Sequence, residues 1–167
     1  MHRLGPLAMA TIALLCLGVA LSSAAVAQSA KDLVGTWALV SSDTVSPGGG
    51  RAPTLGANPT GSLIFTGDGR YIWLFLSTDL PKFASNSRAA GTPEENAAVV
   101  RGSISTFGMY SVAGTNLVFR IEQSTFPNWT ATEQKRTITT FTGDELKWTN
   151  PVGSTGGVAE LAFKRAR

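Results

Sequence analysis

The sequence predicts an all-β protein, an eight-stranded antiparallel meander barrel with one short helix between its third and fourth strands. Three observations support this fold class. Short apolar-rich runs, separated by turn residues, follow one another along residues 35–165, a spacing typical of barrels and sandwiches. Two of these runs flank Gly67-Asp68-Gly69, and Asp-Gly between β-rich segments is a strong hairpin signal. Long helical patterns are absent, except for one short segment that begins near Thr92.

The expected strands follow from these runs. In chain order they cover residues 35–41, 61–66, 70–77, 106–112, 116–124, 131–141, 145–149 and 158–165. The segment 46–60 is rich in Pro and Gly and is expected to be a long loop. The third strand is apolar on both faces, because Tyr71, Trp73 and Phe75 alternate with Ile72, Leu74 and Leu76. We therefore expect a helix or another segment to cover its outer face while its inner face lines the barrel.

That helix is predicted from its first residues. Thr92 is suited to the cap, Pro93 to the first helical position, and Glu95 completes a capping box three residues after Thr92. The helix is expected to end near Gly102. Its buried stripe would consist of Ala97, Val100 and Ile104.

Residues 1–27 have the pattern of a cleavable signal peptide. A basic start precedes an apolar run over residues 7–21, and Ala25-Val26-Ala27 forms an A-x-A cleavage site. We therefore expect an exported protein, periplasmic or secreted, whose mature chain is one domain over residues 28–167 without a transmembrane segment. A membrane anchor is the alternative, although the apolar run is slightly short for a span. A lipid anchor on Cys16 is disfavoured by the bulky residue that precedes it.

Cleavage would remove His2 and Cys16, the single histidine and the single cysteine of the sequence. The mature chain would then lack Ser-His-Asp and Cys-His catalysis and zinc or copper sites built from those side chains. The aspartates are scattered, without the spacing of a calcium site or a glycosidase pair. We expect no cofactor and no metal. Loss of one arginine lowers Lys+Arg from 14 to 13 against 11 Asp+Glu, a net charge near +2. Without a long basic stripe, this charge argues against a nucleic-acid partner.

Several motifs of the chain recur in the same order in a known family. They are LVGTW at 33–37, GSLIFT at 61–66 with Asp68-Gly69, RAAGTPEE at 88–95, FGMY at 107–110 and FPNW at 126–129. In these motifs the chain resembles the bacterial and fungal lipocalin-like domain family, over about residues 33–163. The resemblance implies a calycin-type barrel with an internal cavity. It does not imply one function, because the fold hosts carriers and a few enzymes.

Gly35-Thr36-Trp37 resembles the lipocalin signature on the first strand. The resemblance implies that Trp37 packs in the core at one end of the barrel, under a basic side chain of the last strand. Lys164 and Arg165 are both candidates for this cation–π contact. Strand alternation alone does not choose between them.

Aromatic and apolar stripes are the candidate ligand contacts. An eight-stranded barrel is either filled by side chains or holds one small ligand, so each such residue is a candidate for core packing or for cavity lining. As a set they are typical of a small-molecule site. The predicted ligand-binding residues are Tyr71, Trp73, Phe75, Phe107, Met109, Phe119, Ile121, Glu122 and Arg136.

Glu122 and Arg136 are the most informative polar pair. If the hairpin folds about Trp129, paired residue numbers sum to about 258, which places Glu122 opposite Arg136. One interpretation is an exposed surface pair. The other places both side chains inside the barrel, where they would orient a polar group of a ligand.

Three functions follow from these features. The leading hypothesis is an exported barrel that binds a small apolar or amphipathic molecule. The second is a cofactor-free isomerase or cyclase, with Glu122 as the base and Arg136 or Tyr110 as the electrophilic partner. The third is a packed barrel without a cavity that acts through protein contacts. The volume of the barrel interior distinguishes the first from the third.

Overall fold

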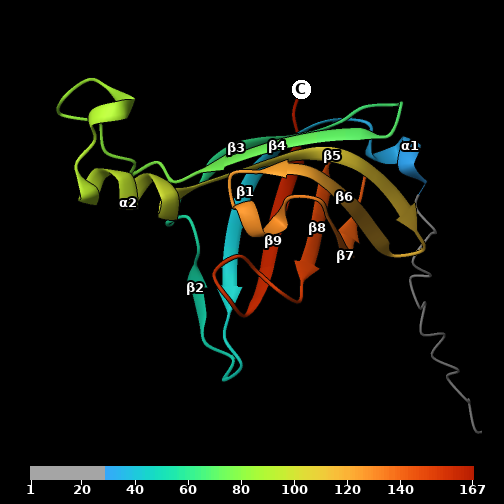
Figure 1. Ribbon diagram of the computed structural model, residues 1–167. Coiled ribbons are helices and arrows are strands. Elements are labelled where there is room, and N and C mark those ends of the chain that lie inside the picture. The colour runs from blue at the N-terminus through green and yellow to red at the C-terminus, as the bar shows by residue number, and fades with distance from the viewer. Residues whose placement is uncertain (1–28) are drawn as a thin grey trace, which may run out of the picture.

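The computed structural model describes residues 29–167, which form one closed β-barrel (Figure 1). The predicted signal peptide, residues 1–27, lies outside the described residues. The strands are β1 (Gly35–Val45), β2 (Arg51–Pro53), β3 (Thr60–Phe65), β4 (Arg70–Leu76), β5 (Ser103–Ala113), β6 (Asn116–Ser124), β7 (Thr132–Phe141), β8 (Glu145–Asn150) and β9 (Val158–Arg165). The helical segments are α1 (Ala30–Leu33), η1 (Arg88–Ala90), α2 (Pro93–Gly102) and η2 (Pro127–Trp129).

Closure of the barrel depends on β1. The strands are ordered β2-β1-β3-β4-β5-β6-β7-β8-β9, and β1 also pairs with β9. β1 reaches both neighbours because it is 11 residues long: its first residues pair with β3, while the ladder to β9 runs from Trp37 to Val45. β2 is a short additional strand beside the far end of β1, which leaves eight strands in the closed barrel. The predicted eight-stranded meander is therefore confirmed.

One end of the barrel is closed by α1 and the signature tryptophan. Trp37 is fully buried and its indole N–H donates to the carbonyl of Leu33 at 2.8 Å. Arg165, not Lys164, covers the ring: its Cζ atom lies 4.1 Å from the Trp37 ring centroid. The register explains the choice, because Arg165 is the direct partner of Trp37 in the β1–β9 ladder. Sequence alternation had left these two residues undecided.

The predicted helix is confirmed with its cap. The Thr92 hydroxyl accepts from the Glu95 amide at 3.2 Å, and the Glu95 carboxylate accepts from the Thr92 amide at 2.8 Å. The other oxygen of Glu95 accepts from the Ala84 amide at 2.8 Å. Glu95 thus joins the start of α2 to the loop that precedes it. Both contacts favour the charged form, so the pKa of the Glu95 carboxyl is lowered.

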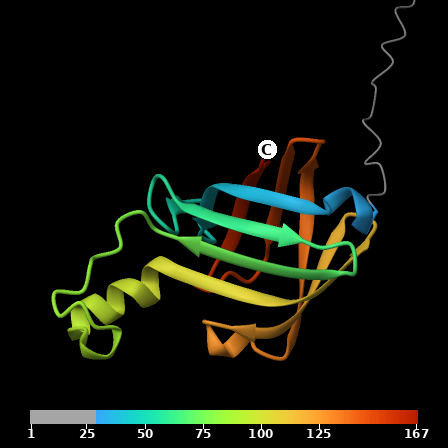
Figure 2. The ribbon, with the colours of Figure 1, turned by 90° about the horizontal axis from the view of Figure 1, so that it is seen from above.

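The expectation that this helix covers β4 is wrong. α2 extends beyond the barrel strands (Figure 2), and Val100, predicted to be buried, is 77% exposed. The reason is local: α2 ends at Gly102 and β5 begins at Ser103, so no loop turns the helix back onto the sheet. On the outer face of β4, Ile72 and Leu74 therefore remain 48% and 46% exposed.

Candidate functional site

A cavity of about 460 Å³ lies at the end of the barrel where α2 joins β5, and α1 lies at the other end (Figure 1). Its walls are mostly apolar, and five of its side chains are aromatic: Trp73, Phe75, Phe126, Trp129 and Trp148. The last turn of α2, the η2 segment and the loop between β8 and β9 contribute to the rim. Eight-stranded barrels of this kind have room for one small ligand, and this volume lies in the range of small-molecule sites.

Arg136 is the buried cation of this cavity. It lies on β7 and is 2% exposed. Its guanidinium donates to the side-chain oxygen of Gln134 at 2.6 Å and to the carbonyl of Lys135 at 3.3 Å. Burial lowers the pKa of Arg136 to about 10, so the side chain is still charged at neutral pH. Within residues 29–167, none of the ion pairs includes Arg136.

Two indole donors of the cavity wall lack partners. In the described part of the chain, Nε1 of Trp73 and Nε1 of Trp148 are buried and have no hydrogen-bond partner. Both rings pack against Phe119, with centroid distances of 5.0 Å and 5.8 Å. The Arg136 Cζ atom lies 5.8 Å from the centroid of the same Phe119 ring. Three donor side chains therefore surround one aromatic ring beneath the cavity.

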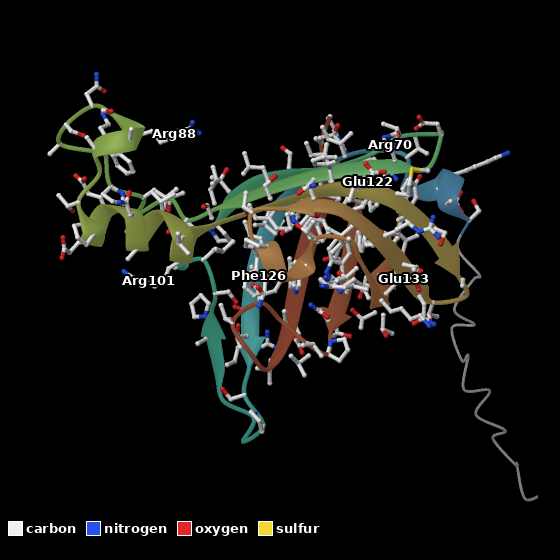
Figure 3. All side chains as sticks on the ribbon, in the orientation of Figure 1. Arg70, Arg88, Arg101, Glu122, Phe126 and Glu133 are labelled. Atoms are coloured by element: carbon white, nitrogen blue, oxygen red, sulfur yellow. The ribbon has the colours of Figure 1, made fainter. Side chains whose placement is uncertain are left out.

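The charge of the cavity wall has one sign. Its charged side chains are Arg136, which is buried, and Arg101, which is exposed near the end of α2 (Figure 3). The described lining contains no Asp or Glu. Asn150 is buried as well, but its amide is engaged with the backbone of Val152. The wall therefore offers a ligand more hydrogen-bond donors and positive charge than acceptors.

Eight of the nine predicted ligand-binding residues, all except Glu122, separate into three groups. Trp73, Phe75 and Arg136 line the cavity. Tyr71, Phe119 and Ile121 are buried in the core without lining it. Burial raises the pKa of Tyr71 to about 12, and its hydroxyl accepts from Thr106 at 3.1 Å. These three residues support the cavity floor.

The third group, Phe107 and Met109, faces outward, so their prediction as cavity residues is wrong. Phe107 is 39% exposed, and Met109 lies 3.7 Å from the guanidinium of Arg70 on the outer face. The inner face of β5 carries Thr106 and Gly108 at this level instead, between Ile104 and Tyr110. Apolarity misleads here because the outside of β4 and β5 is also apolar.

The predicted pairing of Glu122 with Arg136 is also wrong. Arg136 pairs with Leu117 across the β6–β7 ladder, so the paired numbers sum to 253 and not 258. The ladder ends at Ile121↔Thr132, and the connection around η2 is centred earlier than Trp129. The predicted and observed sums differ by five, an odd number. Because side chains alternate between the two faces of a strand, Glu122 lies on the face opposite to Arg136, outside the barrel.

On the outer surface Glu122 forms an ion pair with Arg70, at 2.8 Å between Oε2 and Nη2 (Figure 3). The isomerase hypothesis thereby loses its base. Its other candidate partner, Tyr110, lies at the closed end of the barrel, where its hydroxyl is 3.1 Å from the carbonyls of Ala30 and Thr66. The three residues proposed for catalysis are thus not brought together.

Sequence reasoning missed most of the cavity wall. Trp148 was detectable, because β8 alternates with Leu146, Trp148 and Asn150 buried. Phe126 and Trp129 lie between the two predicted strands 116–124 and 131–141, yet their rings pack together with a centroid distance of 5.6 Å and line the cavity. No strand periodicity marks this segment, and the FPNW motif at 126–129 indicates the family without indicating a cavity wall.

Two further properties bear on the site. Over residues 29–167 there is no cluster of three or more His, Cys, Asp or Glu side chains that could bind a metal ion. Nor does this part of the chain include a helix with the length and apolarity needed to cross a membrane.

Comparisons with known proteins address the family. No curated protein matches the chain. Among solved structures, a redesigned β-barrel is 14% identical with a TM-score of 0.44, covering 86% of this chain and 99% of the other. A de novo designed fluorescence-activating β-barrel is 15% identical with a TM-score of 0.41, covering 82% and 96%. The family model of the lipocalin-like domain matches residues 34–166, nearly the whole described chain. The resemblance predicted from the motifs is confirmed, and the chain belongs to the lipocalin-like domain family.

Proposed function

We propose that this lipocalin-like protein is exported and binds one small amphipathic molecule in the cavity of its barrel. The cavity carries the proposal: about 460 Å³ of space is lined by five aromatic side chains and by a buried arginine. A barrel kept only for its stability would fill this space, since empty volume in a core costs free energy. The aromatic wall suits an apolar body, and the polar groups at its base suit a polar end.

The binding experiment uses a neutral fluorescent probe, N-phenyl-1-naphthylamine, which brightens in apolar surroundings. We expect saturable binding to residues 28–167. Ala159→Phe places a large side chain on the cavity wall, because Ala159 lines it, and should weaken binding by about tenfold or more through lost volume. Ala162→Phe on the same strand is the matched control, because Ala162 lies in a groove on the other side of the sheet.

The proposed function is wrong if the wild-type protein does not bind the probe. It is also wrong if Ala159→Phe binds it as well as Ala162→Phe while both variants keep the circular dichroism of the wild type.

Export rests on the signal-peptide pattern of residues 1–27 and has its own test. Expression of the full chain in a bacterium, followed by intact-mass analysis of the exported fraction, should give a product that begins at Gln28.

A further inference from the structure

We infer that the ligand is an organic anion, a carboxylic acid in its ionised form, whose oxygens accept from Arg136 and from the indole N–H groups of Trp73 and Trp148. The inference rests on the proposed function, because it assigns a chemical class to the ligand of the same cavity. Three features of the cavity carry it.

The first feature is the charge of Arg136. A buried guanidinium costs several kcal/mol in desolvation unless a partner offsets it. Here the partners are a neutral amide oxygen and a main-chain carbonyl, together with the rings of Phe119 and Trp129 at 5.8 Å and 5.5 Å. A guanidinium has five N–H donors. The hydrogen bonds to Gln134 and Lys135 use two of them, so the remaining donors can bind a carboxylate.

The second feature is the pair of free indole donors. Tryptophan N–H groups that are buried normally find an acceptor, and Trp37 of this same chain does so with the carbonyl of Leu33. Trp73 and Trp148 lack an acceptor. Their ring centroids are 6.3 Å apart, so the two unpaired donors belong to neighbouring rings. Trp73, Trp148 and Arg136 all line the cavity, so we assign a ligand acceptor as the partner of these two donors.

The third feature is the sign of the wall. Arg101 adds a second positive charge at the rim, and the described lining holds no carboxylate that would repel an anion. A neutral ketone or alcohol could accept from the indoles, but it would leave the Arg136 charge without a counterion. A cationic ligand would meet like charge. The chemistry therefore selects an acid with an apolar body.

The experiment compares one ligand with and without its charge. Dodecanoate, ionised at pH 7.5 as carboxylic acids are, and methyl dodecanoate compete separately against bound N-phenyl-1-naphthylamine. We expect dodecanoate to displace the probe at a concentration about tenfold lower than the ester, since hydrogen bonds to charged groups are the stronger ones. Arg136→Met should reduce this ratio to near one, with each ligand compared at the affinity of that variant for the probe.

Two further variants complete the design. Arg136→Gln removes the same charge with a polar side chain and should give the same ratio as Arg136→Met. Lys135→Met is the matched control, because Lys135 is the exposed neighbour on β7 and loses one charge without touching the cavity. The wild-type ratio should persist in this variant.

The outcomes separate the two proposals. If the neutral probe does not bind, the proposed function fails. If the probe binds but acid and ester displace it equally, or if the ratio survives in both Arg136 variants, the proposed function stands and the anion inference is overturned.

A spectrum of the indole N–H groups tests the donors directly. Addition of dodecanoate to nitrogen-15-labelled protein should shift the side-chain resonances of Trp73 and Trp148, as expected for new hydrogen bonds. The Trp37 resonance should not move, because its N–H is already bonded to Leu33. Single Trp→Phe variants assign the signals. If the Trp73 and Trp148 resonances do not shift while dodecanoate displaces the probe, the assigned donors are wrong.

Discussion

Arg165 lies over the ring of Trp37 at 4.1 Å and donates to three main-chain carbonyls. The acceptors are Asp32, Val34 and Gly143, at 2.8 Å, 2.9 Å and 2.6 Å. One side chain thus joins the α1 segment, the start of β1 and the β7–β8 turn. We expect this arginine to stabilise the closed end of the barrel.

We expect Arg165→Met to lower the free energy of unfolding by about 2–3 kcal/mol, from the lost charged hydrogen bonds and cation–π contact. Lys164→Met should change it by less than about 0.5 kcal/mol, because Lys164 is exposed. Urea denaturation followed by tryptophan fluorescence measures both. Equal effects of the two variants would contradict the role of Arg165.

Arg136 is expected to reduce the stability of the empty barrel. Its buried charge has no carboxylate partner within the described chain, and replacement of such a group by an apolar one is often stabilising by about 1–4 kcal/mol. We therefore predict that Arg136→Met raises the midpoint of thermal unfolding while it weakens binding of acids. A lower midpoint, with Lys135→Met unchanged, would show that Arg136 stabilises the fold instead.

Gly108 lies where β5 leaves no room for a side chain against the backbone of β6. A Cβ atom at this position would lie 2.1 Å from the carbonyl oxygen of Arg120 and 2.9 Å from the amide of Glu122. We predict that Gly108→Ala costs about 3 kcal/mol, because the backbone of a paired strand must move. Gly67→Ala, with no heavy atom within 4 Å of the added carbon, is the control for chemical denaturation. The β5–β6 register shifts between Phe107 and Gly108, and a tolerated Gly108→Ala would mean that the backbone can move at this irregularity.

The order of the segment before α2 should depend on pH. The pKa of Glu95 is lowered in the fold, first by the Ala84 amide and then by the Thr92 amide. A lowered carboxyl pKa contributes stability that is present above its ordinary value and is lost as pH falls through the lowered value. Hydrogen exchange of the Ala84 and Thr92 amides, compared with that of β-barrel amides at each pH, should therefore lose relative protection below about pH 4.5.

Glu95→Gln should show reduced protection of these two amides already at pH 7. Glu94→Gln, the neighbouring exposed glutamate in the same helical turn, is the control for removal of one charge and should retain it. Protection that is equal in the two variants at pH 7 would contradict the bridging role of the Glu95 carboxylate.

The fold was predictable because its signals are local. The Gly67-Asp68-Gly69 turn, the alternation along β4 and the capping box at Thr92 each depend on neighbours in sequence, and all three appear in the structure. The site was less predictable because it depends on register. Pairing of Arg136 with Leu117 is determined by where the connection through η2 bends, and no residue pattern specifies that point.

The exposure of the outer face of β4 was also not predictable from the sequence. Ile72 and Leu74 indicated that some segment covers the strand, yet they are exposed. Direct passage of α2 into β5 at Ser103 directs the helix outward. Sequence alternation predicts which face of a strand is apolar. Whether that face is buried depends on the direction of the element that follows in the chain.

Closure of the barrel has a consequence for self-association. An apolar strand with a free edge is a template for pairing with another chain. Residues 71–76 of β4 pair with both β3 and β5, so the exposed Ile72 and Leu74 have no unpaired backbone beside them. β1 likewise pairs with β3 and β9. Among the described strands, β2 is the one with a single neighbour in the sheet, and it is three residues long and ends in Pro53. The barrel can therefore display an apolar outer surface without offering a strand on which an amyloid-like sheet could grow.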